Sequence, residues 1–294
     1  MAETLRESLA RGFDLARAAS PEPHTYRVET RIATYSVEGG AQTGTERYSL
    51  ELACVPGSGP EDQRGSCTCA EFSFERGDAG AVEIPALVGW SYPFSLDERW
   101  YDGEGNAYGL VPRRFEGLVD SRGEALPPEV VYQVYSVFVY FHDFTHGLTS
   151  QVGSGDLALH RIGQGTIVEP SETSLEFGST FGEGSVFKGE KMLIELRGVG
   201  LVDDAPCAIL AFRSGGWFTA LMTPAPNVDI KTVGRSRFSG EVFLDLASGW
   251  PTRVAMDLTD VTRTTMGEQV LARAVLETTL DVAVVSRAGT PRAQ

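Results

Sequence analysis

The sequence has little of what would place a protein in a membrane or on nucleic acid. No run of eighteen or more apolar residues occurs, which excludes a membrane-spanning helix. Basic residues are also scarce, because 25 lysines and arginines stand against 40 aspartates and glutamates, for a net charge of −15. Phosphate groups repel such a chain, so we expect neither nucleic acid nor an anionic membrane as its partner.

The sequence motifs of several large enzyme classes are missing as well. We find no P-loop, no GxGxxG dinucleotide fingerprint and no GxSxG nucleophile elbow. No complete catalytic set can be assembled from the residues that are present. The absence of these motifs favours a binding protein over an enzyme.

Residues 1–21 are expected to form a short amphipathic helix and a linker, ahead of the β-rich chain. Charged residues, among them Glu3 and Arg6, interrupt the apolar ones, among them Leu5 and Leu9. A signal peptide needs an uninterrupted apolar segment, so this pattern favours a cytoplasmic protein. Thiols stay reduced in that compartment, and we therefore expect all four cysteines to be free.

Alternation of polar and apolar residues dominates the rest of the chain. Residues 25–37, 45–55 and 67–76 alternate as three strands in meander order, and residues 191–286 contain five or six more. The total is roughly nine or ten antiparallel strands. We divide the chain into a first β-rich half (residues 22–150) and a second (residues 151–287), expected to form one continuous domain.

One apolar stretch, Pro127–Gly147, separates the two halves. Val130, Val134 and Phe138 recur at helical spacing, and two prolines followed by Glu129 resemble a helix start. A strand is the alternative, because aromatic and β-branched residues favour strands. The length of some twenty residues is ordinary for a helix and long for a strand, so we predict an apolar helix.

These elements together predict a mainly β fold. Strands with one apolar face need a cover, and a long sheet tends to curl. We expect a curved antiparallel sheet or open barrel with one central apolar helix and the short N-terminal helix. The meander, the helix in mid-chain and the late hairpin GEVFLDLASGWPTRVAMDL (240–258) resemble the antiparallel half-barrels of the LolA/LppX type and bacterial proteins of unknown function.

The segment HDFTH provides one candidate site at the end of the predicted helix. His142 and His146 are one helical turn apart, as in paired metal ligands, and Asp143 is a third candidate for a divalent metal. The glutamate of the HExxH motif is absent. The alternative is a helix C-terminus that carries histidines because they suit its dipole.

The cysteines provide a second candidate cluster. A symmetric hairpin would place Cys54 opposite Cys67, with Cys69 on the same side of its strand and Phe72 on the opposite side. Three thiols at one end of the sheet could then meet, although the usual CxxC zinc spacing is missing. Cys54 and Cys67 are the pair most able to oxidise.

Aromatic residues provide the third candidate, a ligand-binding cavity. Around a curved sheet they would present apolar rings with polar tips, whereas a large core would use the same residues. The candidate ligand-binding residues are Trp90, Tyr92, Trp100, Tyr135, Tyr140, His142 and His146. We expect them where the helix ends against the loops 90–101 and 153–165.

Two functions follow from these candidates. The first is a non-enzymatic module that binds an apolar or aromatic small molecule, or a protein partner. The alternative is a metal- or histidine-dependent hydrolase or lyase that uses His142, Asp143 and His146.

Overall fold

A computed structural model of the chain describes residues 15, 22–55, 64–77, 80–95, 110, 112–148, 161–168, 172–174, 182–224 and 228–287. The predicted N-terminal helix lies outside these residues, Leu15 apart. The first strands are β1 (His24–Ser36), β2 (Gln42–Val55), β3 (Arg64–Arg76), β4 (Val82–Glu83) and β5 (Ser91–Ser95). The second half contains β6 (Gly165–Val168), β7 (Glu172–Ser174), β8 (Val186–Gly189), β9 (Met192–Val202), β10 (Ala205–Ser214), β11 (Trp217–Thr223), β12 (Ile230–Asp245), β13 (Pro251–Met266) and β14 (Gln269–Arg287).

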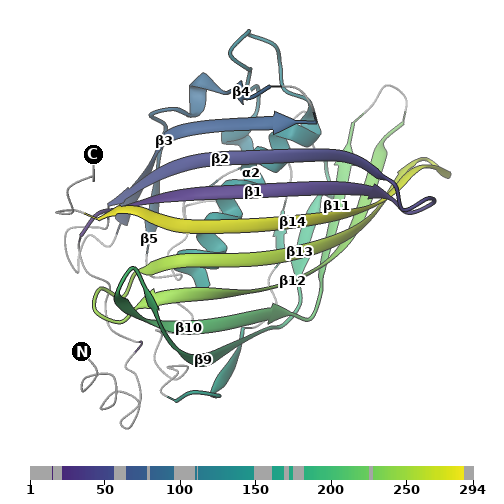
Figure 1. Cartoon of the computed structure of the whole chain (residues 1–294). Coiled ribbons are helices and arrows are strands. Elements are labelled where there is room, and N and C mark those ends of the chain that lie inside the picture. The colour runs from purple at the N-terminus through teal and green to yellow at the C-terminus, as the bar shows by residue number, and fades with distance from the viewer. Residues whose placement is uncertain are drawn as a thin grey trace.

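All of these strands belong to one antiparallel sheet of 14 strands. Its main order is β4-β3-β2-β1-β14-β13-β12-β10-β9-β6, so the first strand pairs with the last and joins the two halves of the chain. Figure 1 shows this sheet in front of the central helix. The sequence predicts fewer strands because β4 to β8 have only two to five residues each, too few to show alternation.

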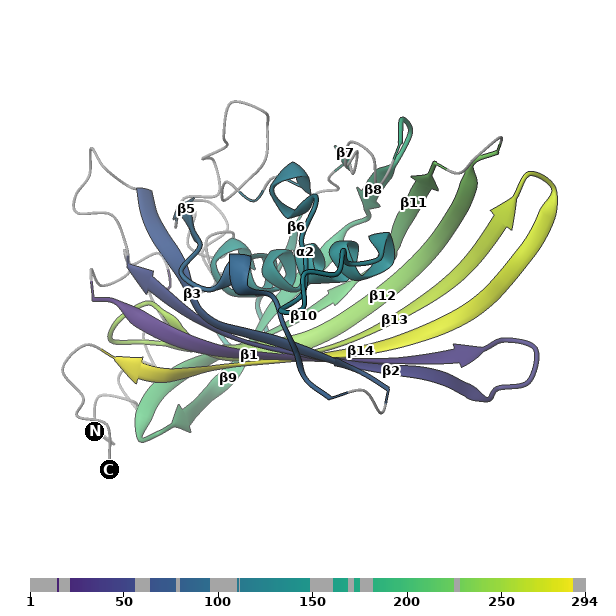
Figure 2. The same ribbon diagram turned by 90° about the horizontal axis from the view of Figure 1, so that it is seen from above.

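The sheet forks at β12, a strand of 16 residues. One edge of β12 pairs first with β11, from Ile230 to Ser236, and then with β10, from Ser239 to Asp245. The other edge pairs with β13 along nearly the whole strand. Figure 2 shows the strands bending toward the helix, so that the sheet has a concave and a convex face.

The helix α2 (Pro128–His142) lies on the concave face and continues as the π-helical turn η3 (Asp143–Gly147). Two short 3-10 turns, η1 (Pro85–Leu87) and η2 (Pro112–Phe115), precede α2 in the chain. Pro127 caps the helix and Glu129 lies in its first turn, as the sequence predicts. The mainly β fold, with a curved open sheet around one apolar helix, is therefore confirmed.

The core forms between α2 and the apolar side chains on the concave face of the strands. Phe138 stacks on Phe72 of β3, while Phe144 stacks on Phe212 of β10 with ring centroids 5.0 Å apart. Phe212 reaches this position because its strand partner is Gly240. A Cβ atom on Gly240 would lie 2.6 Å from Phe212 Cζ and 2.2 Å from the Ala255 carbonyl oxygen, so only glycine fits there.

Two expectations about the cysteine strand are wrong. Phe72 and Phe74 do not face away from Cys67 and Cys69, since all four side chains are buried. A β-bulge explains this, because Leu52 pairs with Cys69 and Glu51 with Glu71, which leaves Ala70 as an extra residue. The bulge reverses the parity of the strand, and sequence alternation alone cannot show it.

The cysteines are also not all reduced. Cys54 and Cys67 are cross-strand partners, as the hairpin predicts, and they form a disulfide. Cys69 and Cys207 are free and buried. Burial raises the pKa of the Cys69 thiol to about 12, so that the reactive thiolate is suppressed.

Candidate functional site

Three of the predicted ligand-binding aromatics form a layer of the core. The Trp90 ring packs against Tyr92, Phe115 and Phe138, with centroids 4.9, 5.4 and 5.5 Å away. Tyr92 and Tyr135 are almost completely buried, while Trp90 is half-buried. The structure thus brings these rings together around α2, with little of their surface left for a ligand. Trp100 lies outside the described residues.

His142 belongs to the same layer. Its side chain is completely buried, and its Nε2 atom lies 2.7 Å from the Tyr92 hydroxyl, within hydrogen-bond distance. The His142 ring meets Tyr92 and Phe141 edge-on. Burial also raises the pKa of Tyr92 well above its ordinary value, so this tyrosine keeps its proton.

Asp143 and His146, the other two residues of the predicted metal site, follow His142 in the chain. Successive helical residues point in different directions, so Asp143 does not share a face with His142. His146 lies in η3, and its side chain is outside the described set. Within the described part of the chain, no three His, Cys, Asp or Glu side chains gather as metal ligands would.

Asp143 instead ends a polar stripe along α2. Tyr132, Ser136, Tyr140 and Asp143 follow one another at spacings of four, four and three residues, which places them on one side of the helix. Burial raises the pKa of the Asp143 carboxyl to about 7. Asp143 in turn contributes to raising the pKa of Tyr140, behind the larger effect of burial.

A row of side chains on the sheet faces this stripe. Trp217 pairs with Ser236, and Ser236 pairs with Asp260, so the three lie side by side on β11, β12 and β13. Alternate residues of a strand point to the same face, and Asp260 follows the buried Met256 and Leu258 in this alternation. Its side chain therefore points to the concave face. Asp260 raises the pKa of both Tyr132 and Tyr140 behind the effect of burial, which shows that stripe and row are close.

Two polar atoms of this row are buried without a hydrogen-bond partner. They are the indole Nε1 of Trp217, a donor, and the carboxyl Oδ1 of Asp260, an acceptor. Burial raises the pKa of Asp260, although a hydrogen bond from Ser236 opposes the shift. Buried polar groups are nearly always paired in folded proteins, so two orphans in one row call for an explanation.

Gly234 provides the space for the Asp260 carboxyl. A Cβ atom on Gly234 would lie 2.8 Å from Oδ1 and 3.0 Å from Oδ2 of Asp260. Any other residue at this position would push the carboxyl aside. We call the set Tyr132, Tyr140, Asp143, Trp217, Ser236 and Asp260 the concave polar site.

The sequence carried a signal for this site that the motif search missed. The inward-pointing residues of β13 are apolar at Val254, Met256 and Leu258, and the next inward position is Asp260. Ser236 similarly precedes Phe238 on the inward parity of β12. A charged residue on an inward parity is rarely buried without a purpose.

The described helices include none that is long and apolar enough to cross a membrane. No family model matches the sequence, and no curated protein matches it either.

Solved structures similar to the chain include a lipovitellin and a LolA superfamily protein. One, on lipid–protein interactions in lipovitellin, has a TM-score of 0.37 and 9% identity over 94% of this chain, which spans only 26% of the lipovitellin chain. The other, a LolA superfamily protein from Nitrosomonas europaea, has a TM-score of 0.14 and 8% identity over 95% of this chain and 91% of that one. A LolA superfamily protein, the type that strand order resembles, is thus among the solved structures found, but matches of this strength assign neither a family nor a ligand to the chain.

Proposed function

We propose that the protein is a non-enzymatic binding module that holds a small apolar or aromatic molecule in the concave polar site. In this proposal a polar group of the ligand meets Asp260 and Trp217, and its apolar part packs between α2 and the sheet. The two halves of the chain act as one domain, since the site takes residues from both.

The observation that carries the proposal is the pair of orphaned polar atoms. Leaving a buried donor or acceptor unpaired costs on the order of 1–3 kcal/mol each. Trp217 and Asp260 are separated by two strand spacings, roughly 10 Å, which one small molecule can span. A ligand with one hydrogen-bond acceptor and one donor would satisfy both atoms.

The surroundings support an apolar body for that ligand. Tyr132, Tyr140 and Trp217 are only partly buried, and Leu221 and Leu276 are partly buried on the neighbouring strands. Leu276 pairs directly with Asp260 and so flanks the row. Rings with polar tips around a few convergent polar groups are typical of small-molecule sites.

The proposal is tested by native mass spectrometry of protein purified without chelator, together with titration of the neutral dye Nile red. Trp217→Phe, which keeps a ring but removes the N–H, and Asp260→Ala should each lose a retained ligand. Trp217→Phe should also weaken the binding of Nile red, whose carbonyl accepts a hydrogen bond, about tenfold. Asp257→Asn is the matched control, because Asp257 lies on the same strand but on the outer face. Equal binding by wild type and both site variants would contradict the proposal.

The alternative of a hydrolase or lyase has one supporting observation. A carboxyl with a pKa of about 7, as in Asp143, suits general acid–base catalysis near neutral pH. The same mass spectra report any divalent metal held by His142, Asp143 and His146. A metal lost on substituting Asp143 and His146 together by alanine would favour this alternative over the binding module.

The disulfide bears on the compartment in which the protein works. Disulfides persist in oxidising compartments and are rare in the cytoplasm, so Cys54–Cys67 supports an oxidising location over the cytoplasmic one expected from the sequence. Thiol titration of denatured, unreduced protein should find the two thiols of Cys69 and Cys207. Four thiols would restore the cytoplasmic expectation.

A further inference from the structure

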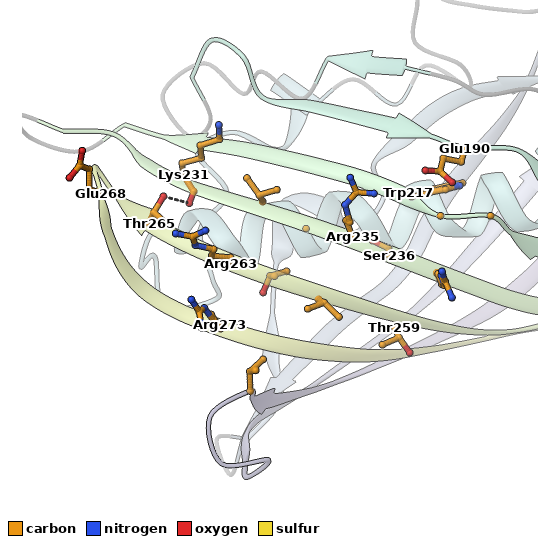
Figure 3. A pocket seen from close by; sticks show the side chains of 18 of the residues that line it. Glu190, Trp217, Lys231, Arg235, Ser236, Thr259, Arg263, Thr265, Glu268 and Arg273 are labelled. Atoms are coloured by element: carbon orange, nitrogen blue, oxygen red, sulfur yellow. Dashed lines mark hydrogen bonds between the residues drawn. The ribbon is translucent and has the colours of Figure 1, made fainter.

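A groove on the convex face gathers positive charge. Figure 3 shows Lys231, Arg235, Arg263 and Arg273 on strands β12 to β14, with α2 behind the sheet. The groove encloses about 1010 Å³ and is lined by five cations, with Arg237 as the fifth, and by two carboxylates, Glu190 and Glu268. Five minus two leaves +3 in the groove of a chain whose net charge is −15. We call these five cations the basic groove.

Two arginines on β1 and β2 of this face form ion pairs with carboxylates, whereas the cations of the basic groove form none within the described residues. Nearer β2, Arg27 pairs with Glu51 and Arg47 with Glu29, each with N–O distances of 2.7 Å. In the described part of the chain, none of the five groove cations lies within ion-pair distance of a carboxylate. The positive charge of the groove is therefore not neutralised by a neighbouring carboxylate among the described residues.

Two of the cations also oppose each other directly. Arg263 and Arg273 are cross-strand partners on β13 and β14, and Arg235 lies on the same face two residues from the partner of Arg263. Like charges in directly opposite positions destabilise a sheet. An anion bound between these arginines would relieve the repulsion.

Exposed apolar side chains surround the same cations. Val37, Val261, Met266 and Leu271 have exposed fractions of 48, 52, 36 and 46%. Val261 pairs with Arg235, and the Val37 amide donates to the Arg273 carbonyl oxygen. Figure 2 shows the β1–β2 and β13–β14 hairpins projecting at this end, beyond α2.

We propose that this end of the sheet docks onto an anionic phospholipid surface. Arginine forks match phosphate oxygens, and aliphatic side chains gain by entering the boundary between headgroups and acyl chains. An acidic protein would satisfy the cations but gives no comparable role to the exposed aliphatic side chains at the hairpins, Val37, Met266 and Leu271, or to Val261 between the cations. The proposal stands independently of the ligand in the concave polar site.

Net charge argued against such a partner, but a membrane acts only on the charges near it. The attraction of a basic segment falls off within a Debye length, about 8 Å at physiological salt. The acidic side chains on the rest of the molecule contribute little at that range. Membrane attraction therefore depends on the local distribution of charge rather than on the net charge, and the cations without ion-pair partners lie at this end.

The test is flotation of the full-length protein with vesicles of phosphatidylcholine alone or mixed with phosphatidylglycerol. We expect binding only to the mixed vesicles, and its loss near 1 M salt, where the Debye length is about 3 Å. Arg263→Glu with Arg273→Glu should weaken vesicle binding by about tenfold or more. Val261→Ser with Leu271→Ser should weaken it at unchanged charge.

Arg253→Glu is the matched control, because Arg253 lies on the same strand and face at the opposite end. It should leave vesicle binding unchanged. Equal losses for Arg253→Glu and for the double charge reversal would overturn the proposal, as would wild-type protein that ignores the mixed vesicles. Retention on immobilised polyglutamate without any vesicle binding would overturn it in favour of an acidic protein.

Discussion

The two ends of strands β12 and β13 share one backbone and differ in chemistry. At the end beneath α2, β13 presents Val254, Met256 and Leu258 to the core, all buried. Toward the other end the same parity presents Asp260, Thr262 and Thr264. Because α2 crosses the strands rather than following them, it covers only one part of each strand (Figure 1).

This contrast explains where the molecule carries stability and where it carries candidate sites. A sheet face needs apolar residues only where something packs on it. At the polar side of the helix that requirement weakens, and the strands can carry Asp260 on the concave face and, farther along, the cations of the basic groove on the convex face. Sites for binding thus lie where packing demands least.

The largest expected effect is at the helix-covered end. Phe138→Asp should lower the free energy of unfolding by about 3–5 kcal/mol, because a charge enters a layer of four aromatic rings. Thr264→Asp at the far end, which replaces a hydroxyl hydrogen-bonded to Thr232, should lower it by only about 0.5–1.5 kcal/mol. Urea denaturation measures both, and comparable losses would abolish the distinction between the two ends.

Two glycines of β12 sharpen the comparison. Gly240→Ala should cost about 1–3 kcal/mol, since its new Cβ meets rigid backbone and Phe212. Gly234→Ala meets only the Asp260 carboxyl and should cost less than about 1 kcal/mol. Gly234→Ala should instead weaken Nile red binding, measured by fluorescence. A variant that binds the dye normally would show that Gly234 does not contribute to the site.

A smaller effect should depend on pH. The pKa of Asp143 rises from 3.8 to about 7 on folding, so the folded protein holds this proton more tightly than the unfolded chain. Asp143 therefore lowers stability progressively as the pH rises from about 4 to 7. The full pKa change corresponds to about 4 kcal/mol, and we expect about 1–3 kcal/mol because the Asp143 side chain is only partly buried. Asp143→Asn should remove this loss and melt higher than wild type at pH 8. Identical melting profiles of the two proteins from pH 4 to 8 would show that the carboxyl is not desolvated.

The smallest effect concerns the repulsion in the basic groove. Arg263→Glu places a carboxylate opposite Arg273 and should raise the free energy of unfolding by about 0.2–1 kcal/mol. Arg253→Glu, opposite Ala283, should not. Thermal melting at low salt measures the difference, and added salt should reduce it. A loss of stability in Arg263→Glu would show that the two arginines do not repel each other.

The sequence was sufficient for the parts of the fold that local periodicity controls. Strands of ten or more residues and the helix at Pro127–Gly147 repeat their pattern often enough to be recognised, and the Cys54–Cys67 pairing followed from hairpin symmetry. The short strands β4 to β8 did not, because two to five residues cannot establish a period. The bulge at Ala70 also escaped, since a single inserted residue leaves no mark on composition.

For the candidate sites, the sequence by itself determined which residue types were present, and only the tertiary structure decided which of them meet. His142, Asp143 and His146 are neighbours in the chain, yet His142 turns into the aromatic core and Asp143 joins the stripe of α2. Trp217, Ser236 and Asp260 are far apart in the chain and become neighbours through strand register. Register depends on long-range pairing over the whole sheet, and that pairing placed the two orphaned atoms in one row.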